Sequence, residues 1–108
     1  MSDNKTRLME LDVHRRKLVR LVGELLQKAD EIDRDSKEQK TKLDREWHGR
    51  LAEVCKDLAA LSQAATGIED LIKSNNANAA QDSLLRSVNI ANHLSRTLNE
   101  LKHEAGQC

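Results

Sequence analysis

Proline, phenylalanine and tyrosine are absent from the chain, and tryptophan occurs once among its 108 residues. Without proline, no residue of the chain forces a helix to break. Aromatic side chains usually supply much of the buried area of a compact core. A core made from this sequence must therefore come mainly from Leu, Ile, Val and Ala, as in helical bundles and coiled coils. These absences favour an all-α fold over a sheet.

The chain also lacks net charge, because 18 basic side chains balance 18 acidic ones. A neutral chain offers no broad basic surface, so we expect neither nucleic acid nor a membrane as a partner. It has no apolar run long enough for a transmembrane helix, and its polar N-terminus does not resemble a signal peptide. Cys55 and Cys108 show no metal or disulfide spacing, which favours an intracellular location, in the nucleus or the cytoplasm.

The first two thirds of the chain carry a heptad-like pattern of apolar residues. The steps between them alternate between three and four, which is typical of the buried seam of a coiled coil. No strong breaker interrupts the pattern, so it predicts one long helix over about residues 5–73. A helix of this length cannot bury its own stripe, and we expect it to pair with a second copy. The predicted seam residues are Leu11, Leu18, Val22, Leu25, Ile32, Leu43, Trp47, Leu51, Val54, Leu58, Leu61, Ala65, Ile68 and Ile72.

A turn and a second, shorter helix should follow, with the whole of residues 1–108 forming a single helical module. The pattern stops at residues 74–78, where Asn75 or Asn76 can adopt the left-handed conformation that ends a helix. Asn78 resembles the N-cap of the next helix. We expect that helix over about residues 79–102, folding back onto the first. Its predicted packing residues are Leu84, Leu85, Val88, Leu94, Leu98 and Leu101.

Trp47, the single aromatic residue, lies in the most polar stretch, since residues 33–51 hold eleven charged side chains in nineteen positions. From Gln39 to Leu51 the apolar pattern advances in steps of four, so the seam is displaced by one residue. A shift of this kind relaxes the supercoil and widens the seam. A large indole would fill the wider layer, and we therefore expect Trp47 to face the seam rather than solvent.

The residues that could carry chemistry do not show the spacing of a site. Asp44 and His48 lie one helical turn apart, which indicates a polar contact rather than a zinc site. Cys55 has neither the glycine-rich turn nor the orienting base of a nucleophile. The basic cluster at residues 14–20 has acidic neighbours and is interpreted as a solvated face. We expect a protein that is not an enzyme, with no catalytic or cofactor-binding residues, no metal and no other cofactor.

Three segments carry a resemblance to a known family. They are LMELDVHRRKLVRLVGELL at residues 8–26, KLDREWHGRLAEVCKDLAAL at residues 42–61, and AATGIEDLIKSNNANAAQDSLLRSVNIANHL at residues 64–94. Together they resemble the coiled-coil region that follows the B-box in tripartite-motif (TRIM) proteins, over roughly residues 8–102. The tryptophan and the Ser-Asn-Asn turn are most similar to the transcriptional-intermediary branch.

The resemblance implies an antiparallel homodimer in which two long helices pair and the shorter helices pack back on them. It also implies a scaffold function, in which the dimer spaces the flanking domains of a ubiquitin ligase or transcriptional regulator. Two alternatives stay open. The chain could be a monomeric three-helix adaptor, broken near Gly49, that receives a partner helix. It could also be one subunit of a hetero-oligomeric helical complex.

Overall fold

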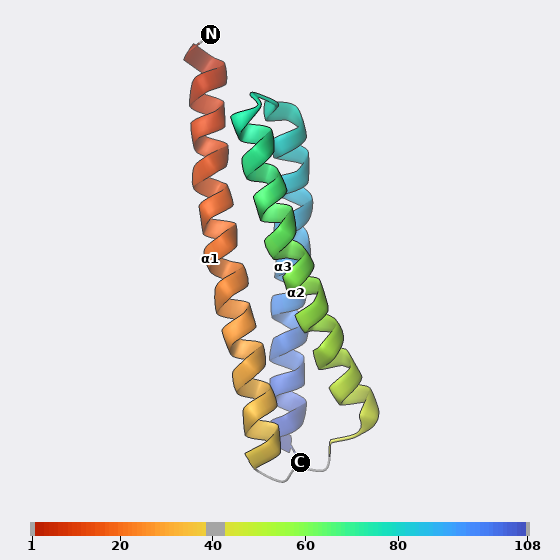
Figure 1. Cartoon of the computed structure of the whole chain (residues 1–108). Helices are drawn as coiled ribbons and strands as arrows, with labels where there is room; N and C mark the ends of the chain where they lie inside the picture. Colours follow the sequence, from red (N-terminus) through yellow and green to blue (C-terminus); the bar gives the residue numbers. More distant parts are fainter. Residues whose placement is uncertain (1, 39–42, 108) are drawn as a thin grey trace.

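The chain folds into three helices in the computed structural model, which describes residues 2–38 and 43–107 (Figure 1). Helix α1 spans Ser2–Glu38, α2 spans Arg45–Lys73 and α3 spans Ala77–Gln107. The described residues include no strand. The expectation of an all-α fold is therefore confirmed.

The three helices lie side by side in an up-down-up bundle. In Figure 1, α1 and α3 run in the same direction and α2 runs in the opposite one. Each helix packs against both of the others. The bundle measures 59 × 17 × 16 Å, so it is an elongated rod.

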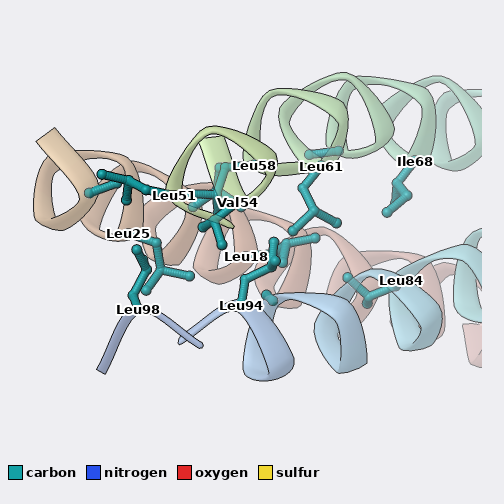
Figure 2. Packing of buried hydrophobic residues seen from close by; sticks show 14 of the residues in the cluster. Leu18, Leu25, Leu51, Val54, Leu58, Leu61, Ile68, Leu84, Leu94 and Leu98 are labelled. Carbon is teal, nitrogen blue, oxygen red and sulfur yellow. The ribbon is translucent and has the colours of Figure 1, made fainter. Parts of the chain in front are cut away.

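The core is a continuous column of aliphatic side chains between the helices (Figure 2). Every helix contributes residues at the three- and four-residue spacing that keeps a stripe on one face. The largest side chains with almost no exposed surface are Leu58, Ile68, Leu98 and Leu101. Alanines are also buried in this core, among them Ala29, Ala65, Ala80 and Ala91. The leucine and alanine content therefore suffices for a core without Phe or Tyr.

The predicted single helix over residues 5–73 does not form. Leu43 and Asp44 are not helical, and α2 begins afresh at Arg45. The Asp44 carboxylate accepts a hydrogen bond from the Trp47 backbone N–H at 2.8 Å, as an N-cap does. The break also lets α1 and α2 bury their apolar stripes against each other within one chain. Part of the predicted helix, residues 39–42, lies outside the described residues.

The displaced register near Trp47 has a different cause from the one that the sequence suggested. The seam does not widen within a continuous helix, because α2 starts there with its own register. Trp47 is nevertheless buried, with 3% of its surface exposed. Its indole Nε1 donates a hydrogen bond to the Leu101 carbonyl oxygen at 3.0 Å. The ring thus joins the start of α2 to the last turns of α3.

The turn between α2 and α3 is tighter than predicted. Asn75 has a φ of 61°, which confirms that an asparagine at 75 or 76 takes the left-handed conformation after the helix end. The N-cap role predicted for Asn78 belongs instead to Asn76, whose side chain accepts a hydrogen bond from the Ala79 backbone N–H. Helix α3 consequently begins two residues earlier than expected and extends to Gln107.

Candidate interaction surfaces

The residues predicted to form a dimer seam lie mostly inside the single-chain core. Leu43 and Ile72 are half-buried. Contact between the predicted seam residues and a second copy stays a prediction, because burial within one chain satisfies the same apolar pattern. The buried seam residues are Leu11, Leu18, Val22, Leu25, Ile32, Trp47, Leu51, Val54, Leu58, Leu61, Ala65 and Ile68.

The residues predicted to pack from the second helix divide into two groups. Leu84, Leu94, Leu98 and Leu101 are buried, and Val88 is half-buried. Leu85 instead has 61% of its surface exposed. Consecutive residues on a helix point about 100° apart, so Leu84 and Leu85 cannot both face the centre of the bundle.

Leu85 lies on the rim of a groove between α1 and α3, with a volume of about 610 Å³. We call it the α1/α3 groove. Polar side chains at its edges are Arg7, Glu10, His14, Lys17 and Gln81. The sequence pattern did not predict this groove, because it depends on how far apart two helices lie. Its apolar lining comes from Leu11, Leu18, Leu21, Leu84, Leu85 and Val88.

Within the described residues, side-chain hydrogen bonds connect α1 to α3 at two levels. Arg7 donates to the Gln81 side-chain oxygen within the α1/α3 groove. Farther along both helices, Lys28 donates to the Asn99 side-chain oxygen. These contacts tie α1 and α3 together at separated levels. Of the apolar lining of the groove, Leu85 is exposed and Leu21 and Val88 are half-buried, whereas Leu11, Leu18 and Leu84 are buried.

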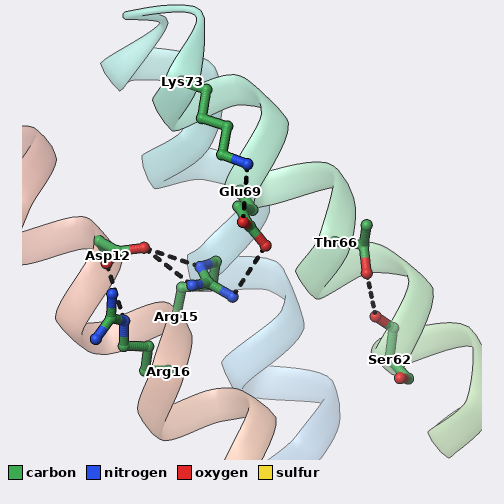
Figure 3. A network of polar contacts seen from close by, with 7 residues as sticks. All are labelled: Asp12, Arg15, Arg16, Ser62, Thr66, Glu69 and Lys73. Atoms are coloured by element: carbon green, nitrogen blue, oxygen red, sulfur yellow. Dashed lines mark hydrogen bonds and ion pairs between the residues drawn. The ribbon is translucent and has the colours of Figure 1, made fainter.

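A polar network links α1 to α2 (Figure 3). The Arg15 side chain is only 13% exposed and pairs with Asp12 at 3.0 Å and with Glu69 at 3.5 Å. Glu69 also pairs with Lys73 at 3.1 Å. The hydrogen bond from Lys73, together with the charges of Lys73 and Arg15, lowers the pKa of Glu69. Arg15 lies between the seam residues Leu11 and Leu18 on the buried face of α1. Its charge is tolerated there because the guanidinium reaches the carboxylates of Asp12 and Glu69 at the edge of the core.

Ion pairs of Arg50 link α2 to α3. Arg50 Nη1 lies 3.1 Å from both carboxylate oxygens of Glu104, and Arg50 Nη2 lies 3.5 Å from Glu100. Arg50 is about one-third exposed, so solvent screens these pairs and their contribution to stability is small. Their main effect is to align the start of α2 with the end of α3.

Of the residues considered for metal binding or catalysis, His48 and Cys55 line one pocket together with Asp30 and Asp33, and Asp44 is not part of it. The Asp44 carboxylate caps α2, and the His48 ring packs edge-on against Trp47 with centroids 5.0 Å apart. Cys55 is half-buried, and burial raises the pKa of its thiol, with Asp33 and Asp30 acting in the same direction. Over residues 2–38 and 43–107, no three His, Cys, Asp or Glu side chains gather where they could hold a metal ion.

Comparisons with known proteins leave the chain without a family assignment. It matches no protein-family model, no curated protein and no solved structure. In the described part of the chain, no helix has the length and apolar character needed to cross a membrane. The resemblance to TRIM coiled coils therefore stays a prediction based on the quoted segments alone.

Proposed function

We propose that the chain is a non-enzymatic interaction module, a monomeric three-helix bundle that acts as an adaptor for another helical protein. One observation carries this proposal. The chain buries its main apolar stripe internally and still presents an apolar groove between α1 and α3. A module with a complete core does not need a second copy to fold, so its remaining apolar surface is available for recognition.

The polar contacts between helices support a monomeric bundle. The Arg15 network holds α1 to α2, and the Trp47 indole holds α2 to α3. In the described residues, no buried side-chain nitrogen or oxygen lacks a hydrogen-bond partner. The buried polar side chains of this part of the chain therefore find their hydrogen-bond partners without a second copy.

A second candidate function is the TRIM-like dimerisation scaffold. Only residues 39–44 separate α1 from α2. If these helices joined into one, α1 of each copy could pack against α2 and α3 of the other and bury the same apolar residues. Exchange of an identical element between copies is a known route to a dimer. The resulting antiparallel homodimer would space flanking domains of a TRIM-like regulator or ubiquitin ligase.

Light scattering coupled to gel filtration separates the two candidates. The adaptor should elute with a mass near 12.2 kDa at every concentration, with a scattering envelope close to the 59 Å length of the bundle. The scaffold should have twice that mass and a longer envelope. A dimer that persists on dilution would overturn the adaptor proposal.

A further inference from the structure

We infer that the α1/α3 groove binds an amphipathic helix of another protein, with an apolar stripe flanked by acidic side chains. This inference rests on the proposed function of the chain as an adaptor. It adds the site, the chemistry of the partner and the direction in which the partner helix lies.

The lining of the groove fits the apolar face of a helix. Leu21 and Val88 are only half-buried, and Leu85 has 61% of its surface exposed. The α1 wall runs from Arg7 to Leu21. This distance is about 21 Å at 1.5 Å per residue, which equals roughly four helical turns. A partner helix of about four turns would follow the α1 wall and cover Leu85, and the α3 wall from Gln81 to Val88 would contact about two of its turns.

The charges at the groove favour acidic flanks on that helix. Along α1, the lining includes two cations, Arg7 and Lys17, against a single carboxylate, Glu10. The α3 wall is uncharged, since it consists of Gln81, Leu84, Leu85 and Val88. Asp and Glu side chains on the partner's α1-facing side would meet this basic edge. Complementary charges of this kind select partners and accelerate their association.

The helix directions favour a partner that runs opposite to α1 and α3. These two helices are neighbours that point the same way (Figure 1), and residues of both line the groove. A helix inserted antiparallel to both would complete an up-down-up-down four-helix bundle.

A second copy of this chain fits the groove less well. In a two-fold symmetric pair, each surface meets its own equivalent. When the helices of the two copies run antiparallel, the basic edge of α1, with Arg7 and Lys17, lies opposite the same edge of the other copy. Like charges in contact disfavour this pairing, whereas a separate acidic helix meets no such repulsion.

A binding experiment with two helical peptides tests the chemistry of the partner. Both probes are fluorescein-labelled, carry leucines at the three- and four-residue spacing, and differ only in having glutamates or lysines beside the stripe. In fluorescence anisotropy at low salt, the glutamate peptide should bind about tenfold more tightly. The preference should shrink at high salt, where charges are screened. Equal binding of both peptides, or binding of neither, would overturn the inference.

Matched variants test the location. Leu85→Ala should weaken binding of the glutamate peptide about tenfold, as truncation of a central apolar contact does. Ile90→Ala should not weaken it, because Ile90 is a similarly exposed aliphatic residue of α3 outside the groove. Likewise, Lys17→Glu should reduce affinity and Arg20→Glu should not. Equal effects within each pair would contradict the groove as the binding site.

Two further measurements separate the ways in which the idea can fail. A nitroxide at the peptide N-terminus should broaden amide signals of Leu21 and Val88, and broadening at Arg7 and Gln81 would overturn the antiparallel orientation.

Light scattering of the chain alone tests the proposed function. A monomer that ignores the peptide contradicts only the groove inference. A dimer that Leu85→Ala converts to monomer would instead show a second copy in the groove and overturn both.

Discussion

Leucines that look equivalent in the sequence lie in very different surroundings. Leu58 has none of its surface exposed, whereas Leu85 has 61% exposed. The heptad-like pattern correctly selects Leu58, because its neighbours at three- and four-residue spacing are apolar on both sides. The Leu84–Leu85 pair is ambiguous, since a pattern of two adjacent leucines does not say which one faces the core.

Truncation of these two leucines should therefore have different effects on stability. Leu58→Ala removes a fully buried side chain and should lower the free energy of unfolding by about 2–5 kcal/mol. Leu85→Ala should change it by no more than about 0.5 kcal/mol, as most surface substitutions do. Urea denaturation followed by circular dichroism measures both. A loss at Leu85 as large as the loss at Leu58 would contradict the position of α3 in the bundle.

Glu69 should make the stability of the chain depend on pH. Its pKa is lower in the folded chain because of Lys73 and Arg15. A carboxyl group with a lowered folded pKa contributes stability above its unfolded pKa, and this contribution disappears as the pH falls through the folded pKa. Glu69→Gln should therefore lower the melting temperature at about pH 7, and the difference should shrink as the pH falls below the ordinary pKa of a glutamate. Glu53→Gln, at an exposed position of α2, is the control.

A constant difference in melting temperature between the wild type and Glu69→Gln across this pH range would argue against the ion pairs of Glu69.

The sequence alone did not predict the ion pairs of Glu69. Arg15 and Glu69 are 54 residues apart, and only the antiparallel packing of α1 and α2 brings them together. The same holds for the hydrogen bond from Trp47 to the Leu101 carbonyl, although the pattern did predict that Trp47 faces apolar residues.

At the scale of the helices, spacing and turn chemistry predicted most of what forms. The three- and four-residue steps marked the buried faces of α1, α2 and α3, and the asparagines marked the turn before α3. The expectation of one helix over residues 5–73 missed the break before α2, and only the three-helix alternative placed a break nearby. The signal of this break is the single N-cap Asp44 within a highly charged stretch, and such a stretch looks the same on the exposed face of a continuous helix.

Gly49 lies inside α2, so the break that the adaptor hypothesis placed there falls a few residues earlier. An added Cβ at Gly49 would meet no neighbouring atom within 4 Å. Gly49→Ala should therefore stabilise the chain by about 1 kcal/mol, because alanine favours the helix and glycine does not. Thermal unfolding measures the gain.

The control for this prediction is Gly106→Ala, which is equally unhindered but lies in the last turn of α3. Helix ends fray, so alanine should help less there. If Gly49→Ala destabilised the chain instead, the helical conformation of that position would be wrong.

At the scale of the whole molecule, the sequence could not specify where the apolar stripes are buried. A single chain folded at residues 43–44 and two chains paired along a continuous helix cover the same side chains. The difference lies in chain connectivity and in the cost of association, and the apolar pattern contains neither. The all-α fold was therefore predictable, while the three-helix arrangement remained one of several alternatives.

Removal of α3 tests whether the three helices form one cooperative unit. A chain that ends at Asn76 lacks Leu84, Leu94, Leu98 and Leu101, which complete the core. The remaining apolar faces of α1 and α2 would be exposed to solvent and should cause aggregation or loss of helix. Circular dichroism and light scattering measure this. A truncated chain that keeps its mass per copy and its helicity per residue would contradict a shared core.

Three passes of the chain along one axis place Ser2 and Gln107 at opposite ends of a body 59 Å long (Figure 1). A pulling force applied through these two ends acts along the helix axes, and it loads the contacts between helices in shear. Many packed side chains must then yield together, whereas an even number of passes would place both ends on the same side and let the helices peel apart in sequence. A bundle with an odd number of helices can therefore transmit tension along its length.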